Sequence, residues 1–291
     1  MHDNLPAADD RAFALPDHRL IALRGRDAVA FAQAQFMNDV GLLEPRCWQW
    51  NGWLTPKGRV LALFALLKLS DEELWLLLPD ADPAELAAAL QRFVFRSKVR
   101  IEVCQDLHVS GSFAAPSMAQ GSALGGDGGV DAVELDLGGE AGPRALRIAL
   151  AAVATDDAEA VARWQTFDLA HGLPRLPASQ AGHWTPQQLS LERLQAFSVK
   201  KGCYPGQEIV ARTHFLGQAK RGLALLEGDT ALPTGADVMA GPTPLGKLVA
   251  SAQADGRNVA LAVLPLEREP QALSTGDAAL RELPLRGGLG R

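Results

Sequence analysis

The pattern of apolar residues changes once along this chain of 291 residues, close to Arg221. Before that point, apolar runs of strand length are separated by stretches in which apolar residues recur at helical spacing. After it, only short apolar runs remain, and Gly, Pro, Asp and Asn residues separate them. The change predicts an α+β region followed by a small antiparallel β-barrel over residues 216–291. The Gly-rich end, residues 287–291, is expected to be loose.

The α+β region is predicted to hold two α/β domains, over residues 1–104 and 105–170. In the first, strands are expected at 19–23, 47–54, 60–69, 73–78 and 98–103, with helices at 27–37 and from Pro83 to about residue 95. This order is typical of a split β-α-β layer with its helices on one face. In the second, strands are expected at 109–113, 130–137 and 145–151, with a helix at 156–170.

Residues 171–215 are expected to complete the first domain, with helical stretches near 186–195 and 209–213. Residues 121–129 are rich in Gly. They predict a surface hairpin in preference to a phosphate-binding loop, because neither a helix start nor Lys-Ser/Thr follows them.

The charge balance excludes a general attraction to nucleic acid. Lys and Arg number 28 and Asp and Glu number 34, so the net charge is 28 − 34 = −6. A chain with no overall positive field can hold a phosphate backbone only through a local patch. Arg212, His214, Lys220 and Arg221 form the candidate patch for RNA or a partner protein. Direct tRNA binding is the less favoured expectation.

The cysteines argue against a disulfide framework and against a metal site. Cys47, Cys104 and Cys203 are odd in number, far apart and outside any C-x-x-C, so no bound metal is expected. The acidic N-terminus lacks the apolar core of a signal peptide, and Lys68 interrupts the longest apolar stretch, 60–69. These features predict a cytoplasmic protein with no membrane partner.

The densest group of chemically active residues is Lys200-Lys201-Gly202-Cys203, followed by Tyr204-Pro205-Gly206-Gln207-Glu208. The two glycines permit a tight turn or a close approach of the backbone to a ligand. The two lysines and a helix that begins near Pro205 would both favour the reactive thiolate of Cys203. Tyr204 is the only tyrosine of the chain.

Two other interpretations of Cys203 stay open on residue chemistry alone. The cysteine could be a buried, inert residue in a turn. It could also be the nucleophile of a Cys–His hydrolase, with His171, His183 or His214 as the base. No spacing singles out one of these histidines.

The stretch Lys-Gly-Cys-Tyr-x-Gly-Gln-Glu resembles the signature of the YgfZ family. These are folate-binding proteins implicated in iron–sulfur cluster assembly or repair and, through it, in tRNA modification; their fold is similar to that of the glycine cleavage T-protein. The resemblance extends to residues 25–40, 54–59, 96–99, 164–174 and 182–213, and is weakest over 105–155.

This resemblance implies a T-protein-like ring of two related α/β domains and a C-terminal β-barrel around a folate-sized opening. It implies tetrahydrofolate or another folate as cofactor, and iron–sulfur client or assembly proteins as partners. Cys203 falls on the cysteine that the family needs. The residues expected to bind folate are Trp164, Lys200, Lys201, Gly202, Tyr204, Gly206, Gln207 and Glu208. A second folate-contacting tryptophan of some relatives is replaced by His18.

The competing function is a tetrahydrofolate-dependent aminomethyltransferase like the T-protein itself. In that family an Asp in a Gly-Gly-x-x-Asp-Asp stretch is catalytic. The similar stretch here is 58–63, and Ala62 and Leu63 stand at the carboxylate positions. Neither residue can transfer a proton. The sequence therefore favours a folate-binding accessory protein, and not a conventional enzyme, that supports iron–sulfur enzymes and, through them, tRNA modification. A protein that only binds, without a role for the thiol, is the remaining alternative.

Overall fold

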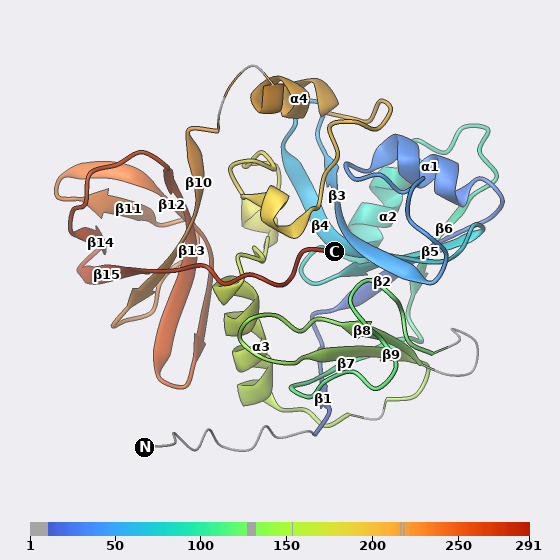
Figure 1. Ribbon diagram of the computed structural model, residues 1–291, viewed down its shortest axis with the longest axis horizontal. Coiled ribbons are helices and arrows are strands. Elements are labelled where there is room, and N and C mark those ends of the chain that lie inside the picture. The colour runs from blue at the N-terminus through green and yellow to red at the C-terminus, as the bar shows by residue number, and fades with distance from the viewer. Residues whose placement is uncertain (1–10, 127–131, 153, 216, 218) are drawn as a thin grey trace.

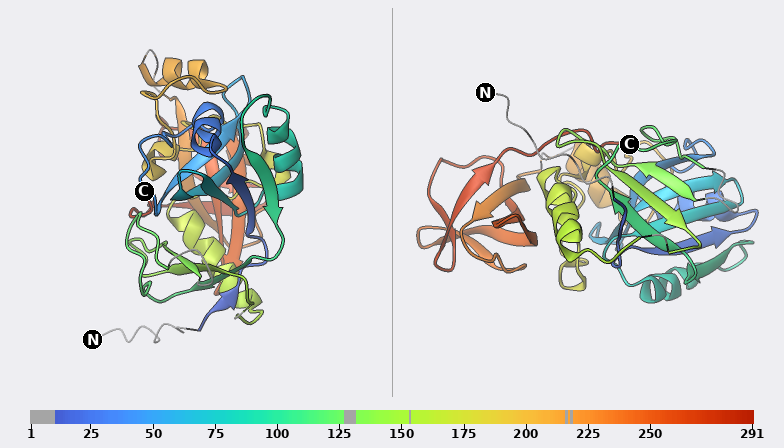
Figure 2. Two further views of the ribbon diagram at one scale, coloured as in Figure 1. Left: turned by 90° about the vertical axis from the view of Figure 1, so that its right-hand side faces the viewer. Right: turned by 90° about the horizontal axis from the view of Figure 1, so that it is seen from below.

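The computed structural model describes residues 11–126, 132–152, 154–215, 217 and 219–291. Its strands form a five-stranded sheet, a four-stranded sheet and a closed barrel. The barrel lies on one side of the helix α3 (Ala158–Ala170), and the two sheets lie on the other side (Figures 1 and 2). No helix among the described residues is both long and apolar enough to span a membrane.

The five-stranded sheet comes from the first part of the chain. Its order is β3-β4-β5-β2-β6, with antiparallel neighbours. The strands are β2 (Arg19–Arg24), β3 (Cys47–Leu54), β4 (Val60–Ser70), β5 (Glu73–Leu78) and β6 (Arg100–Cys104). Side chains alternate between the two faces of a strand. Ile21, Leu23 and Phe64 therefore pack under α1 (Ala28–Gln35) and α2 (Pro83–Gln91), while Leu20 and Leu63 face the other way.

The helix expected to reach residue 95 ends earlier, at Gln91. The Asp82 side chain accepts a hydrogen bond from the Glu85 N–H at 2.9 Å and caps its N-terminus. At the other end the chain turns, and Phe93 packs edge-on against Trp53 with 5.8 Å between ring centroids. The loop 92–99 then leads into β6.

The four-stranded sheet has the order β1-β7-β9-β8. Its strands are β1 (Phe13–Ala14), β7 (His108–Ser112), β8 (Val133–Asp136) and β9 (Ala145–Ala149). The short strand β1, which the sequence did not predict, adds Phe13 and Ala14 to the edge of this sheet. Part of the strand expected at 130–137, and part of the Gly-rich loop at 121–129, lie outside the described residues.

The barrel closes in the order β10-β13-β12-β11-β14-β15. Its strands are β10 (Arg221–Gly228), β11 (Asp237–Ala240), β12 (Thr243–Ala254), β13 (Arg257–Pro265), β14 (Leu273–Thr275) and β15 (Ala278–Leu283). The predicted antiparallel barrel is confirmed. The sequence missed β11 and β14, because strands of four and three residues carry almost no periodic signal.

The segment between α3 and the barrel is largely irregular. It contains η1 (Ala178–Gln180), η2 (Leu191–Leu194) and α4 (Gln207–Phe215). The helical stretch expected at 186–195 is wrong, since only the short 3₁₀ helix η2 forms there. Ser190 and Gln195 border it with φ of 47° and 55°, and such left-handed residues end a right-handed helix on both sides.

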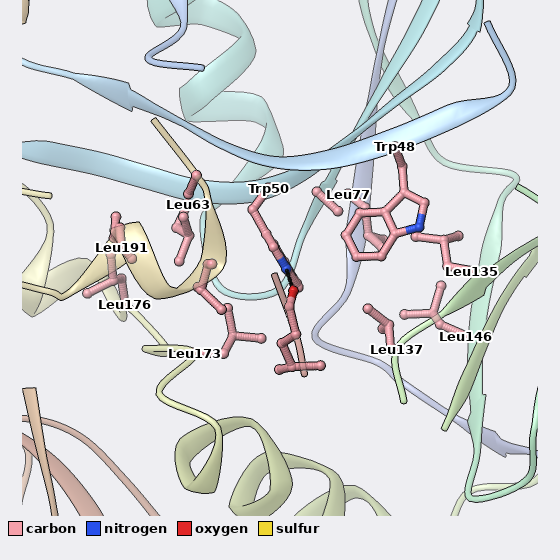
Figure 3. Packing of buried hydrophobic residues seen from close by; sticks show 14 of the residues in the cluster. Trp48, Trp50, Leu63, Leu77, Leu135, Leu137, Leu146, Leu173, Leu176 and Leu191 are labelled. Atoms are coloured by element: carbon pink, nitrogen blue, oxygen red, sulfur yellow. Dashed lines mark hydrogen bonds between the residues drawn. The ribbon is translucent and has the colours of Figure 1, made fainter. Parts of the chain in front are cut away.

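The space between the two sheets is filled with side chains. Figure 3 shows Trp48 and Trp50 from β3 between leucines of the four-stranded sheet and leucines of the segment that follows α3. Leu135 and Leu146 come from the sheet, and Leu173 from that segment. Close packing of these side chains leaves little free volume at the centre of the molecule.

Residues 284–291, which we call the C-terminal segment, run from the barrel back to this centre (Figure 1). Leu289 is only 2% exposed, and its carbonyl accepts a hydrogen bond from Trp50 Nε1 at 2.8 Å (dashed in Figure 3). The Arg291 guanidinium donates to the carbonyls of Asp136 and Gly138, both at 3.1 Å. The expectation of a loose end is therefore wrong, because one apolar anchor and several hydrogen bonds hold the segment.

Candidate functional site

Backbone carbonyls of the protein bind the side-chain ammonium of Lys201. Its Nζ donates to the carbonyls of Gln33 and Phe36 at 2.6 Å each and of Asn38 at 3.0 Å. These carbonyls surround the C-terminal end of α1, where backbone oxygens lack partners within the helix. An ammonium has three protons to donate, so the group is fully used. Burial lowers the pKa of Lys201 to about 8.

Tyr204 and Gln207 form hydrogen bonds to the loop that carries the motif, residues 198–206. The Tyr204 hydroxyl donates to the Ser198 carbonyl at 3.0 Å, and Gln207 Nε2 donates to the Lys201 carbonyl at 2.9 Å. The Lys201 ammonium lies 5.0 Å from the centre of the Tyr204 ring, which favours the cation. Burial raises the pKa of Tyr204. Through their hydrogen bonds, Tyr204 and Gln207 stabilise loop 198–206.

The two glycines of the motif have different surroundings. Gly206 has a φ of +80°, and a Cβ there would lie 2.6 Å from the Thr55 carbonyl oxygen and 2.7 Å from the Gly58 Cα. The loop is thus pressed against the turn between β3 and β4 at a point where only glycine fits. A Cβ on Gly202 would meet nothing within 4 Å. The expectation of a tight turn or close approach applies to Gly206 and not to Gly202.

Cys203 projects from this anchored loop. It is exposed, as are Lys200, Gly202 and Glu208, while Cys47 and Cys104 are half-buried. The residues around Cys203 are therefore fixed, and the thiol itself is open to solvent. The expectation of a buried cysteine is therefore wrong.

No histidine nitrogen forms a hydrogen bond with the Cys203 thiol within the described part of the chain. His171 is engaged elsewhere, since its Nδ1 pairs with the Phe167 carbonyl at 2.7 Å and its Nε2 accepts from the Ala141 N–H at 3.3 Å. A Cys–His hydrolase therefore finds no support. In the same described residues, no group of three or more His, Cys, Asp or Glu side chains is placed to hold a metal.

Trp164 lies in a different place from the motif. It belongs to α3 and is 1% exposed. The Arg144 guanidinium carbon lies 4.0 Å above its ring, and a Cβ on Gly111 would lie 2.8 Å from the ring. In Figure 1 and in the left view of Figure 2, α4 is at the top of the molecule and α3 lies below its centre. The structure does not bring Trp164 and Cys203 together.

A buried ion pair supports Trp164, and no local pattern in the sequence indicated it. Arg144 is 0% exposed and Asp168 1%, and 2.7 Å separates Nη1 from Oδ1. The same guanidinium lies 4.1 Å above the Phe167 ring, so it is held between two aromatic rings. Burial lowers the pKa of Arg144. Removing one partner of such a pair leaves an uncompensated charge in the core.

The cavity beside Trp164 does not fit a folate. Its volume is about 20 Å³, and His18, Trp50 and Asp168 are among its lining residues. That volume holds roughly one water molecule, whereas pockets for small ligands measure about 300–1,000 Å³. Burial, and then the nearby arginines, lower the pKa of His18 well below its usual value, so this histidine is neutral. The motif residues 198–208 do not line the cavity.

A larger hollow of about 690 Å³ lies between the edges of the two sheets. Its lining includes Arg19, His108 and Arg147, and none of the residues expected to bind folate. This hollow and the motif residues 198–208 are thus separate in the fold.

Comparison with known proteins agrees with the fold and the motif. No family model matches the chain. The tRNA-modifying protein YgfZ of Photobacterium profundum is 30% identical over 280 residues, which cover 86% of this chain and 82% of that protein. The YgfZ of Colwellia psychrerythraea is 29% identical over 239 residues, or 77% of this chain and 73% of that protein.

Among solved structures, the aminomethyltransferase T of the glycine cleavage system from Bartonella henselae shares the fold. The TM-score is 0.69 and the sequence identity 15%, over 94% of this chain and 86% of that one. The predicted T-protein-like α+β fold is therefore confirmed. With relatives at this identity over most of their length, the chain belongs to the YgfZ family.

Proposed function

We propose that this protein supports tRNA modification through the exposed thiol of Cys203, as an accessory to iron–sulfur enzymes. The observation that carries the proposal is the contrast within the motif. Lys201, Tyr204 and Gly206 are bound to the rest of the protein, and Cys203 is left exposed between them. A thiol on a rigid, accessible loop suits an encounter with a macromolecule, in which it acts as a transient ligand or nucleophile. The relatives named tRNA-modifying proteins support the same direction.

The matched pair Cys203→Ser and Cys104→Ser tests this role. Each variant replaces the family protein in cells, and mass spectrometry measures the thiolated nucleosides of tRNA that depend on iron–sulfur enzymes. Cys203→Ser should lower those nucleosides to the level of the deletion strain, and Cys104→Ser should leave them unchanged. Equal, wild-type levels in both variants would refute the role of the thiol.

A folate ligand is a second part of the proposal. In the described arrangement the cavity beside Trp164 is too small for a pterin, so binding would require the core around Trp50 to open. Trp50 also donates from its indole to the Leu289 carbonyl of the C-terminal segment, so opening of this core would break that contact.

Titration with tetrahydrofolate tests the ligand through tryptophan fluorescence of the wild type and of Trp164→Phe. Saturable quenching that is weaker in the variant supports folate binding at this centre. No quenching refutes the folate part, and the proposal for Cys203 is then judged by the cellular experiment alone.

The described residues at the positions of the T-protein carboxylates do not favour aminomethyl transfer. Ala62 and Leu63, at the positions of the T-protein carboxylates, are 3% and 4% exposed and pack in the core from β4. Neither side chain can move a proton at a folate amine. We therefore propose no transferase activity.

A further inference from the structure

The loop 92–99 presents a surface that the Cys203 motif does not account for. Phe95 is 86% exposed and Phe93 40% exposed, although phenylalanine is usually buried. Exposed cations flank the two rings, namely Arg92, Arg96 and Lys98. The loop contains no acidic residue.

The charged groups of these three side chains are not used in ion pairs among the described residues. The ion pairs at this edge of the five-stranded sheet use Arg24, Arg26 and Arg100, and no pair among the described residues involves the cations of loop 92–99. Asp27 contacts the loop, where its carboxylate accepts from the Lys98 backbone N–H at 2.6 Å. A free cluster of this kind is notable in a chain with a net charge of −6, because it concentrates positive potential at one place.

A short series of contacts connects this loop to the loop of Cys203. Phe93 packs on Trp53, Trp53 forms a β-bridge with Phe36, and the Phe36 carbonyl accepts from Lys201 Nζ at 2.6 Å. The Phe93 side of loop 92–99 is therefore linked to loop 198–206 at the C-terminal end of α1, whereas its Lys98 side lies at Asp27, the N-cap of the same helix. Figure 1 shows the loop that leads into α4 beside α1. Loop 198–206 adds the exposed Lys200 and also has no acidic residue.

We propose that loops 92–99 and 198–206 together form a contact surface for an unpaired loop of RNA. The inference rests on the proposed role in tRNA modification and names the partner that meets Cys203. An unstacked base lies on the Phe95 ring, and the cations beside it bind the neighbouring phosphates. A duplex does not offer such a base, because its bases are stacked within the helix. An acidic peptide could neutralise the cations, but it has no need of the exposed ring.

The test uses fluorescence anisotropy with a labelled RNA stem-loop, the fully paired duplex of the same stem and a polyglutamate peptide, each at several salt concentrations. The variants are Phe95→Ala and the double change Arg92→Gln with Arg96→Gln. Matched controls are Leu150→Ala and Arg147→Gln, which change an exposed apolar residue and an exposed cation at the four-stranded sheet. All substituted side chains are exposed, so the variants should fold normally.

The stem-loop should bind more tightly than the duplex. Phe95→Ala should weaken stem-loop binding roughly tenfold or more without changing the salt dependence, since stacking carries no charge. The double arginine variant should lower the slope of log K against log salt by about 1.4, because each phosphate that is no longer neutralised reduces the slope by about 0.7. The two controls should match the wild type.

Three results would overturn the proposal: no binding of the stem-loop at micromolar protein, equal affinity for Phe95→Ala and Leu150→Ala, or polyglutamate binding that depends on Phe95 as strongly as RNA binding does. The last result would assign the surface to an acidic protein. The thiol role is judged by tRNA thiolation in cells with Cys203→Ser and Cys104→Ser, whereas the RNA surface is judged by the binding of Phe95→Ala and the double arginine variant. Failure of the RNA surface and failure of the thiol role are thus seen in different measurements.

Discussion

Substitution of Gly206 by alanine should destabilise the protein far more than the same change at Gly202. At Gly206 an alanine would adopt a φ near +80°, which costs about 1–2 kcal/mol in the left-handed region. Its Cβ would also lie 2.6 Å from the backbone oxygen of Thr55, and a forced backbone shift costs about 1–3 kcal/mol. The sum is about 2–5 kcal/mol. Gly202 has an ordinary φ and open space around it, so its change should stay within about 0.5 kcal/mol.

Urea denaturation followed by tryptophan fluorescence measures both variants against the wild type. A loss of about 3 kcal/mol is a large share of the ~5–15 kcal/mol that holds a typical domain together, so the midpoint of Gly206→Ala should fall clearly. Equal midpoints for the two variants would refute the argument that the turn between β3 and β4 fixes loop 198–206 through Gly206. A large loss in Gly202→Ala alone would refute the assignment of Gly202 to open surface.

Three further outcomes follow from groups described above. Burial lowers the pKa of Lys201 to about 8 from 10.5, so between these pH values the unfolded chain binds more protons than the folded chain. The free energy of unfolding of the wild type should therefore rise relative to that of Lys201→Met as pH rises from 8 to 10, as measured by urea titration. A difference that stays constant with pH contradicts this. Asp168→Asn should lower the free energy of unfolding by about 3–5 kcal/mol in the same assay, because the buried Arg144 charge loses its partner. A decrease of less than about 1 kcal/mol contradicts this. Iodoacetamide at neutral pH should label Cys203 well before Cys104, since Cys203 is exposed and burial raises the pKa of Cys104; peptide mass spectrometry that finds equal rates contradicts it.

The elements that the sequence predicted well are those whose signal is local. Strands β3 (Cys47–Leu54) and β5 (Glu73–Leu78) lie at their predicted bounds. Turn residues border both strands, β5 is a continuous apolar run after Glu73, and tryptophans supply most of the apolar signal of β3. The barrel was predicted from repeated turn residues. The stretch near 186–195 shows the limit, since its helical spacing was real but the left-handed Ser190 and Gln195 are set by the tertiary contacts around them.

In the candidate site, too, features that depend on neighbouring residues could be predicted, and features that depend on distant residues could not. The motif residues are adjacent in sequence, so their common location could be predicted. The expected close approach of the backbone holds for Gly206 and not for Gly202. The partner of Lys201 could not be predicted, because the carbonyls that bind its ammonium come from the region of α1, 163–168 positions earlier in the chain. Arg144 and Asp168 are likewise paired only by the meeting of the sheet and α3, and nothing local marks a charged residue for burial.

The hydrogen bond between Trp50 and Leu289 joins residues 239 positions apart, and this separation bears on the order of folding. Closing so long a loop costs more entropy than pairing β3, β4 and β5, which follow one another in the chain. The sheet should therefore form early and the C-terminal segment should dock late. Leu289 is buried and Leu285 is only partly buried, so the segment should open at a lower free energy than the two sheets. Hydrogen exchange should find the amide of Gly287 far less protected than those of β4.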